Sequence, residues 1–277
     1  MDLELTGHRV LVTGSSRGIG KAIAAGFAAE GAVVALTGRT QAALLAACEE
    51  LAAARPGCRV EGFPADLTAP GAAETLAEEV RARLGGLEHL VCNLGSGRSV
   101  PVLQEDAAEW ERMLRLNLLC AADSVRAFLP LLPKPGQVGQ SGGVGQSGVA
   151  GEASVSPSIT FVSSICGVEH LGCPTAYAAA KAALRSYAKT IAEPLGRQGI
   201  RVNVVAPGNV LFPGSTWEAK LERDSRGVLE SIASQVPLER FGTAREIADV
   251  VVFLASRRAG FVAGAQWVVD GGQARQL

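Results

Sequence analysis

The sequence has few residues of several kinds that mark particular classes of protein. Its 277 residues include three histidines and two tyrosines, and aromatic residues make up 5% of the chain. The histidines are widely spaced and the six cysteines form no C-x-x-C pair, so neither a metal site nor a disulfide framework is predicted. We therefore expect reduced cysteines in a cytoplasmic protein with no bound metal.

The charged residues show no excess of either sign. The 26 Lys and Arg residues balance 27 Asp and Glu residues, for a net charge of −1. This balance gives no electrostatic case for binding nucleic acid or an anionic membrane. No apolar run reaches the roughly 18 residues of a membrane-spanning helix, and the start of the chain, MDLELTGHRV, does not resemble a signal peptide. Hydrophobic residues make up 48% of the chain, which is enough for a sizeable core.

Short apolar segments alternate with amphipathic segments along the chain. The apolar segments predict seven strands, at residues 9–14, 32–38, 59–63, 87–95, 159–163, 200–208 and 266–272. Helices are predicted between them, including long ones over 106–132 and 175–197. This alternation is typical of a single α/β domain, with a doubly wound, seven-stranded parallel sheet of the Rossmann type.

One stretch does not follow this alternation. Residues 134–158 are rich in glycine and serine and have few large apolar side chains, which predicts a flexible insertion. The insertion precedes the fifth predicted strand, whereas ligands of open α/β sheets bind beyond the carboxyl ends of the strands. We therefore expect it to lie away from the chemistry.

A glycine-rich turn, TGSSRGIG at residues 13–20, joins the first predicted strand to the first predicted helix. Gly14 permits a sharp turn, Gly18 lets the backbone approach a pyrophosphate, and Gly20 lets the helix pack close to the strand. The helix N-terminus then offers N–H groups and a positive dipole end to the phosphates. The spacing differs from the usual G-x-G-x-x-G, and the alternative interpretation is a purely structural turn.

The second predicted strand ends in Thr37-Gly38-Arg39 and carries no acidic residue there. An acidic residue in this region binds the ribose of NAD, whereas a nearby arginine accommodates the 2′-phosphate of NADP. Arg17 and Arg39 therefore predict NADP as the cofactor, with NAD possible. The alternative is a pair of solvated arginines.

The ends of two further strands add candidate cofactor contacts. Small residues around Asn93 and Gly95 let a cofactor lie across the sheet edge, and Asp66 could meet an adenine. The alternative for Asp66 is the N-cap of the next helix.

Tyr177 and Lys181 are four residues apart in an alanine-rich segment, so they share one face of a helix. Tyrosine has an unperturbed pKa of about 10, and a neighbouring ammonium group lowers that pKa by favouring the phenolate. Such a pair can exchange a proton with a substrate, although most pairs with this spacing are solvated neighbours.

Three more polar residues are candidates for the same site. Ser163 and Ser164 end the fifth predicted strand, where a hydroxyl could hold a carbonyl oxygen or merely cap the strand. Asn117 lies on an apolar helix face, where its amide requires hydrogen-bond partners. It could equally be a buried asparagine that braces a neighbouring strand.

Together these motifs resemble the classical short-chain dehydrogenase/reductase family over nearly the whole chain except residues 134–158. TGSSRGIG is similar to the family's cofactor loop. The family's catalytic residues match Asn117, Ser164, Tyr177 and Lys181, and Ser164 is preferred to Ser163 by its spacing to Tyr177.

The resemblance implies a role for each of these residues. Tyr177 would exchange the proton with the substrate oxygen, and Ser164 would orient the carbonyl. Lys181 would bind the nicotinamide ribose and lower the pKa of Tyr177. Asn117 would hold a water molecule that relays protons through Lys181.

The resemblance also implies a set of cofactor contacts and a lid. The expected cofactor-binding residues are Gly14, Ser16, Arg17, Gly18, Ile19, Gly20, Arg39, Asp66, Leu67, Asn93, Gly95, Tyr177, Lys181, Pro207, Gly208 and Val210. A mobile substrate lid is expected at about residues 209–236, with Trp217 as a candidate for closing over the substrate. His170 and Cys173 are further candidate pocket residues, although plain packing is an alternative for each.

The sequence departs from the family pattern at two positions. The usual N-N-A-G reads Cys92-Asn93-Leu94-Gly95, so the floor beneath the adenosine ribose carries a bulkier side chain. Phe212 stands where the family often has a threonine that meets the nicotinamide carboxamide. The backbone near Val210 is then expected to anchor the nicotinamide.

These features predict an NADP(H)-dependent oxidoreductase that interconverts a carbonyl and an alcohol of a small molecule by hydride transfer. The 3-oxoacyl-[acyl-carrier-protein] reductases are the nearest type, although Glu193-Pro194 occupies a site that is often basic in them. The alternatives are a reductase of carrier-bound 3-oxoacyl thioesters or a non-catalytic dinucleotide-sensing protein. The resemblance further implies a homo-oligomer, with a tetramer favoured and a dimer possible, paired through the helices at 106–132 and 175–197.

Overall fold

The protein is described by a computed structural model that covers residues 1–133 and 156–275. Seven parallel strands form its central sheet in the order β3-β2-β1-β4-β5-β6-β9. Their bounds are β1 Arg9–Val12, β2 Val33–Gly38, β3 Val60–Pro64, β4 His89–Cys92, β5 Ser158–Val162, β6 Arg201–Pro207 and β9 Gln266–Val269. The predicted seven-stranded, doubly wound parallel sheet is confirmed.

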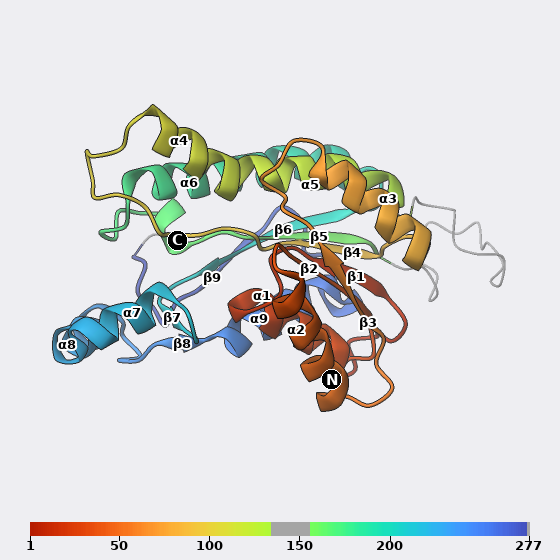
Figure 1. Ribbon diagram of the computed structural model, residues 1–277, viewed down its shortest axis with the longest axis horizontal. Helices are drawn as coiled ribbons and strands as arrows, with labels where there is room; N and C mark the ends of the chain where they lie inside the picture. The colour runs from red at the N-terminus through yellow and green to blue at the C-terminus, as the bar shows by residue number, and fades with distance from the viewer. Residues whose placement is uncertain (134–155, 276–277) are drawn as a thin grey trace.

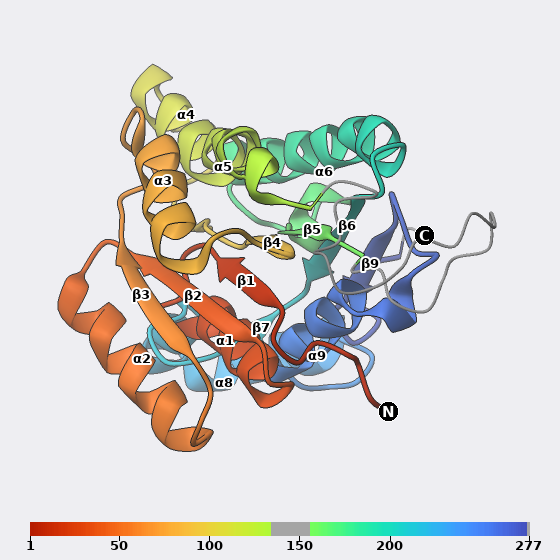
Figure 2. The same cartoon turned by 90° about the vertical axis from the view of Figure 1, so that its right-hand side faces the viewer.

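Helices cover both faces of this sheet (Figures 1 and 2). One layer contains α1 (Gly18–Ala29), α2 (Gln41–Ala54) and α9 (Ala244–Ala255). The other contains α3 (Ala72–Leu84), α4 (Ala107–Leu114), α5 (Cys120–Phe128) and α6 (Thr175–Gly196). Successive residues of a strand point to opposite faces, so Leu11 joins the second layer's core whereas Val10 and Val12 join the first. Among the described residues, no helix combines the length and the apolarity needed to cross a membrane.

The end of the predicted flexible insertion differs from the expectation. Residues 134–155 lie outside the described residues. Ser158, however, is buried and opens β5, and its Oγ lies 2.9 Å from Nδ1 of His89. The expectation was therefore wrong at this end, because a polar serine enters the core when a neighbouring strand supplies a hydrogen-bond partner.

The single helix predicted over residues 106–132 is divided in the structure. A π-helical turn, Arg115–Leu119, separates α4 from α5, and a 3₁₀ turn, Leu129–Leu131, follows α5. Nδ2 of Asn117 donates to the carbonyl oxygen of Met113 at 3.1 Å, in competition with the backbone ladder. Turns of this kind inside α-helices are frequent at functional sites.

The predicted lid, residues 209–236, contains regular structure that the sequence did not indicate. It includes the short strand β7 (Val210–Leu211), which pairs with β8 (Gly242–Thr243). Two helices follow β7, namely α7 (Thr216–Arg223) and α8 (Ser225–Gln235). This lid unit projects from the sheet at the carboxyl ends of its strands (Figure 1).

Gly20 marks the closest approach of α1 to the sheet, as predicted. A Cβ atom at this position would lie 2.4 Å from the carbonyl oxygen of Gly14 and 2.5 Å from Nδ2 of Asn93. We expect Gly20→Ala to lower the free energy of unfolding by about 1–3 kcal/mol, because the turn must shift to relieve this overlap. Urea denaturation followed by circular dichroism measures the effect.

The matched control is Gly196→Ala in the last turn of α6, where an added Cβ meets no atom within 4 Å. This control should be neutral or stabilising, and an equal loss in both variants would contradict the packing argument.

Candidate active site

Tyr177 and Lys181 lie one turn apart near the start of α6, as the sequence predicts. Lys181 is 3% exposed, and its Nζ donates to the carbonyl oxygen of Val162 at 2.9 Å and lies 5.9 Å from the centre of the Tyr177 ring. Loss of hydration lowers the pKa of Lys181 to about 8. The ammonium group therefore sits in the interior with few partners, at the end of β5.

The pKa of Tyr177 differs from the expectation. Desolvation of its hydroxyl raises the pKa, and a hydrogen bond with Ser164 opposes that rise. Lys181 was expected to lower this pKa, but its Nζ is directed to the backbone of β5. Burial is therefore the stronger effect here, and the phenol stays protonated at neutral pH.

The two adjacent serines at the end of β5 have different partners. Ser164 lies close enough to the Tyr177 hydroxyl to lower its pKa, and its Oγ accepts the N–H of Cys166 at 3.1 Å. Ser163 instead donates from its Oγ to the backbone carbonyl of Lys181 at 3.2 Å. The structure thus brings Ser164 into the site and uses Ser163 to hold α6 against the strand, which agrees with the choice made from spacing.

Asn117 is 1% exposed and braces the loop that follows β4. Its Oδ1 accepts the N–H of Ser96 at 2.9 Å, and its Nδ2 donates to the carbonyl oxygen of Ser96 at 3.2 Å. A Cβ at Gly95 would lie 2.7 Å from that Oδ1 and 3.0 Å from Nζ of Lys181. Gly95 is therefore required for the loop to pass Asn117 and Lys181, and the expected water relay stays a prediction.

The glycine-rich turn has the conformation that its glycines suggest. Gly14 and Gly18 have φ angles of +64° and +58°, in the left-handed region that favours glycine. The N-cap of α1 receives no side-chain hydrogen bond, and the first turn of the helix carries no acidic residue. The backbone N–H groups at this helix end are therefore available to an anionic ligand.

Cross-strand hydrogen bonds hold this turn, and the sequence analysis missed one of the residues that form them. Thr13 Oγ1 accepts the N–H groups of Asn93 and Leu94 at 2.9 and 3.0 Å. Asn93 Nδ2 donates to the carbonyl oxygens of Thr13 and Gly14 at 3.0 and 3.1 Å. Its position at the end of a strand, directly before Gly14, is the feature of the sequence that could have indicated this role for Thr13. The side chain of Asn93 thus shapes the cofactor turn from beneath.

The two predicted phosphate-binding arginines face different neighbours. Arg17 donates from Nη1 to the carbonyl oxygen of Gly214 in the lid at 3.4 Å. Arg39 lies near Asp66, whose pKa is lowered mainly by a hydrogen bond from Thr68 and to a smaller extent by the charge of Arg39. Asp66 is not a helix N-cap, because α3 begins after Gly71. The ends of β2 and β3 therefore lie side by side, whereas Arg17 reaches across the site to the lid.

The remaining predicted cofactor positions lie on the same edge. Ser16 contacts the end of β2, since a Cβ at Gly38 would lie 3.0 Å from its Oγ. Ile19 packs on the core beneath α1, and Leu67 is buried. Gly208, after Pro207, approaches Asp270 so closely that a Cβ would lie 2.6 Å from the Cβ of Asp270.

The lid enters the site through Phe212, the residue that replaces the family's usual threonine. Its Cε2 lies 2.6 Å from the position that a Gly18 Cβ would take. The aromatic ring thus covers the surface of the glycine-rich turn, with Val210 buried behind it in β7. The absence of a side chain at Gly18 therefore serves this contact as well as the expected approach of a phosphate.

The three candidate substrate-pocket residues have different surroundings. Trp217 packs on Phe241, with ring centroids 5.3 Å apart, so a residue just beyond the lid holds its ring. Cys173 lies beside Cys166, next to the Ser164 turn. His170 is exposed. Cys173 thus lies near the predicted chemistry, whereas no contact in the described structure ties His170 to it.

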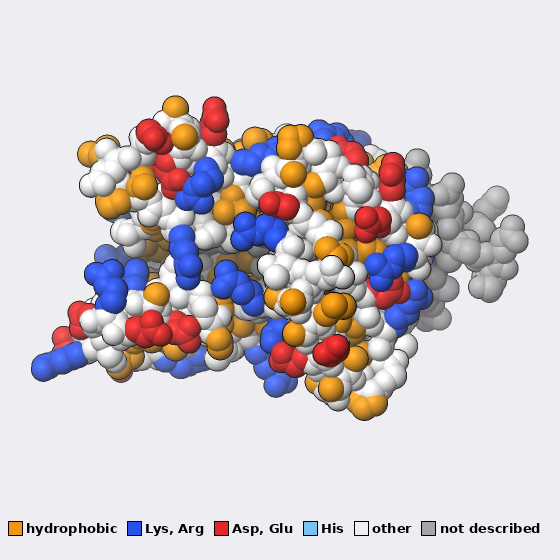
Figure 3. Space-filling view, viewed as in Figure 1, with side chains coloured by type: hydrophobic (Ala, Val, Ile, Leu, Met, Phe, Trp, Pro, Cys, Tyr) orange, Lys and Arg blue, Asp and Glu red, His pale blue; other side chains and the backbone are white. Residues whose placement is uncertain are grey.

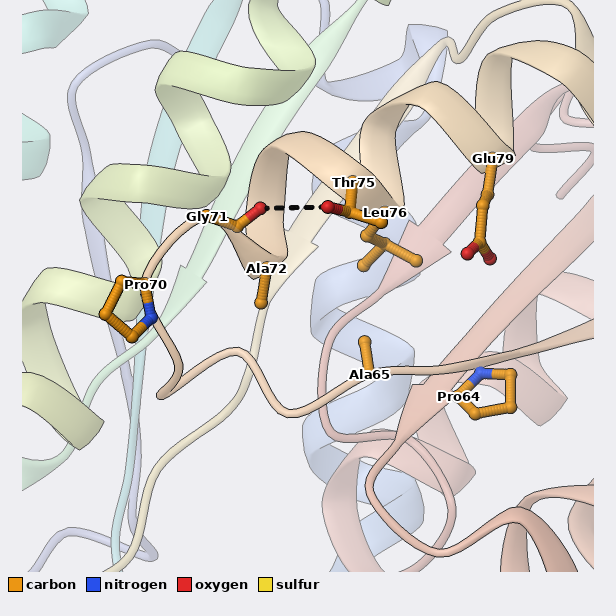
Figure 4. Close-up of a pocket in the computed structure, with 8 residues that line it drawn as sticks. All are labelled: Pro64, Ala65, Pro70, Gly71, Ala72, Thr75, Leu76 and Glu79. Atoms are coloured by element: carbon orange, nitrogen blue, oxygen red, sulfur yellow. Dashed lines mark hydrogen bonds between the residues drawn. The ribbon is translucent and has the colours of Figure 1, made fainter.

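Two small hollows lie beside the candidate site. One of about 280 Å³ adjoins the start of α3 and is lined by Pro64, Ala65, Pro70, Gly71, Ala72, Thr75, Leu76 and Glu79 (Figure 4). None of these residues is a predicted site residue. The other, of about 130 Å³, lies under the base of the lid and includes the Arg240–Glu246 ion pair. Between the α4–α6 layer and the lid the molecular surface is hollowed, with Lys and Arg side chains on the rims (Figure 3).

A parallel sheet with a glycine-rich turn before α1, and a serine, tyrosine and lysine grouped beyond β5, defines a dinucleotide-dependent oxidoreductase. The model of a family described as "Enoyl-(Acyl carrier protein) reductase" matches residues 14–274. The chain belongs to the short-chain dehydrogenase/reductase family, as the sequence motifs suggest.

Relatives with several names resemble the chain over nearly its full length. It is 33% identical over 271 residues to nodulation protein G of Rhizobium sp. (strain N33), with 98% of each chain covered. It is 33% identical over 270 residues to the 3-oxoacyl-[acyl-carrier-protein] reductase FabG of Escherichia coli (strain K12), again with 98% of each covered. Among solved structures, L-sorbose reductase from Gluconobacter frateurii, complexed with NADPH and L-sorbose, is 31% identical with a TM-score of 0.86 and full coverage of both chains.

Proposed function

We propose that the protein is an NADP(H)-dependent oxidoreductase that interconverts a carbonyl and an alcohol of a small molecule. The observation that carries this proposal is the grouping of Ser164 and Tyr177 beside the buried ammonium of Lys181, whose Nζ lies 5.9 Å from the centre of the Tyr177 ring. All three lie at the sheet edge that also holds the glycine-rich turn. The NADPH in the similar L-sorbose reductase structure supports the choice of cofactor.

The residues of this edge fit a phosphorylated dinucleotide. The uncapped N-terminus of α1 offers N–H groups to the diphosphate, and Arg39 offers a cation to a 2′-phosphate. Within the described structure, Nζ of Lys181 has one hydrogen-bond acceptor for its three hydrogens. Ribose hydroxyls would supply the acceptors that this buried group lacks.

Residues of this site would also carry out the proton transfer of the reaction. NADPH, when bound, supplies the hydride. The protonated hydroxyl of Tyr177 would donate its proton to the carbonyl oxygen of the substrate, and Ser164 would hold that oxygen by a hydrogen bond. Lys181 would fix the ribose and stabilise the phenolate that remains, while Asn117 would keep the Gly95–Ser96 backbone in place.

Arg39 provides a test of cofactor choice. We expect Arg39→Ala to raise the Kd for NADPH about tenfold, which is the effect of losing one charge-assisted hydrogen bond. The Kd for NADH should change little, because NADH lacks the 2′-phosphate. Fluorescence titration measures both constants. Arg55→Ala, beyond the far end of α2, is the control. Equal losses for NADPH and NADH would contradict the assignment of Arg39.

A 3-oxoacyl thioester on a carrier protein is a second candidate substrate, favoured by the similarity to FabG. Exposed Glu193, paired with Arg197 at 2.8 Å, occupies a position that is often basic in carrier-protein reductases. We therefore prefer a free small molecule. Much faster turnover of a carrier-linked 3-oxoacyl group than of its free thioester would reverse this preference.

We also propose a homo-oligomer in the cytoplasm, with a tetramer favoured over a dimer. The edge strand β9 exposes Val268, and Phe261 before it is fully exposed, which suits an interface between subunits. The six cysteines are all free, as suits a reducing compartment. Light scattering at micromolar concentration tests the assembly, and a monomer would contradict it.

A further inference from the structure

Arg98 lies beside the candidate catalytic residues but was not predicted as a site residue. It follows Gly97, where an added Cβ would lie 3.6 Å from Cε1 of Tyr177. Its backbone is fixed, because its N–H donates to Oγ of Ser96 at 3.2 Å and its carbonyl oxygen accepts from Arg112 at 2.9 Å. The exposed side chain of Arg98 therefore starts from a rigid point next to the tyrosine ring.

The guanidinium of Arg98 crosses the mouth of the site and meets a second cation at the lid. Its Nη2 donates to the carbonyl oxygen of Gly214 at 3.1 Å, and Nη1 of Arg17 donates to the same oxygen at 3.4 Å. The acid beside them, Glu218, accepts the N–H of Gly214 at 2.6 Å. In residues 1–133 and 156–275, neither arginine forms an ion pair. Two like charges thus converge at one carbonyl oxygen, and neither is in a direct ion pair with the neighbouring Glu218.

The lid helix α7 carries a third cation, Lys220. Nζ of Lys220 lies 4.2 Å from the centre of the Trp217 ring. Its charge also reaches Cys166, whose pKa is lowered chiefly by the hydrogen bond from Cys173 and least by Lys220. Lys220 lies on α7, which begins two residues after Gly214, the residue whose carbonyl oxygen both arginines contact. Lysine and arginine side chains are visible on both rims of this hollow (Figure 3).

We propose that Arg98 and Lys220 form a subsite for an anionic group, a carboxylate or a phosphate, carried by the substrate at a distance from its reacting carbonyl. The proposal rests on the proposed function and names the substrate class. The planar guanidinium presents paired donors that match a carboxylate or phosphate, and the ammonium adds a point charge. Arg17 belongs to the glycine-rich turn and is left to the cofactor, whereas Arg98 lies on the Tyr177 side.

Two four-carbon aldehydes test the subsite, one ending in a carboxylate and the other in a methyl group. We expect the wild-type protein to reduce 4-oxobutanoate with a kcat/KM at least tenfold above that for butanal. Arg98→Gln should remove most of this preference by raising KM for 4-oxobutanoate, with kcat and the Kd for NADPH nearly unchanged. Lys220→Met should also raise KM for 4-oxobutanoate, but by a smaller factor than Arg98→Gln. Arg185→Gln, an equal charge change on exposed α6, should leave the preference intact.

Calorimetry provides a readout that does not depend on turnover. Glutarate and inorganic phosphate are titrated separately into the protein saturated with NADP⁺. The ligand with the lower Kd shows whether the subsite prefers a carboxylate or a phosphate. A Kd for the anion that is at least fivefold higher in Arg98→Gln than in the wild type supports the subsite. No binding of either anion, or an Arg98→Gln effect on the Kd for NADPH instead, overturns it. Failure of the proposed function would look different, because NADPH would bind and no carbonyl compound would oxidise it.

Discussion

Tyr177→Phe should lower kcat about a thousandfold, within the range for losing a positioned proton donor, and leave the Kd for NADPH within about twofold. The phenylalanine ring retains the packing of Tyr177 beside Gly97 but has no proton to give to the substrate oxygen. NADPH oxidation followed at 340 nm with a reducible carbonyl compound measures the first quantity, and fluorescence titration measures the second.

The chain contains its own control for this substitution. Tyr187 is the only other tyrosine in the sequence and lies three turns farther along α6, where its ring packs edge-on against Phe161 with centroids 5.9 Å apart. Tyr187→Phe removes the same atom from the same helix away from the site. It should retain near wild-type turnover. Activity preserved in Tyr177→Phe, or lost equally in both variants, would exclude Tyr177 as the proton donor.

Ser164→Ala should lower kcat/KM about a hundredfold, because one positioned hydrogen-bond donor to the reacting oxygen is lost. It should also shift the pH profile. The hydrogen bond with Ser164 lowers the pKa of Tyr177, so its loss raises that pKa further. Because reduction requires the protonated phenol, activity should then be lost at higher pH than in the wild type. A pH profile of kcat/KM measures the shift.

The neighbouring Ser163 gives the matched control. Ser163→Ala removes the hydrogen bond to the carbonyl oxygen of Lys181 and should cost about 1 kcal/mol of stability. Its kcat/KM should stay within a few-fold of wild type, with no shift in the pH profile. If Ser163→Ala were the inactive variant and Ser164→Ala the active one, the assignment of the two serines would be reversed.

Features that depend on neighbours in the sequence were predictable. The alternation of strands and helices fixes the layers, and the four-residue spacing of Tyr177 and Lys181 fixes their common helix face. The glycines of the cofactor turn were predictable for the same reason, since their φ angles and close contacts arise within one strand–turn–helix unit.

Features that depend on distant parts of the chain were not. Arg17 contacts Gly214 in the lid, and Thr13 supports the backbone after β4; neither partner can be deduced from local pattern. The pKa of Tyr177 was misjudged because helix spacing shows that Lys181 is near, but not that its Nζ turns to β5 and that burial dominates. Asn117 shows the same limit, since its π-helical turn is tied to contacts across the fold.

The structure of the protein with NADP⁺ bound is the most direct test of the central claim that this sheet edge is a carbonyl-reduction site. The account predicts the diphosphate at the N-terminus of α1, the 2′-phosphate at Arg39, and the nicotinamide ribose hydrogen-bonded to Lys181, with the nicotinamide ring beside Tyr177 and Ser164. A nicotinamide held away from Tyr177, with Lys181 still bonded only to the carbonyl oxygen of Val162, would contradict it.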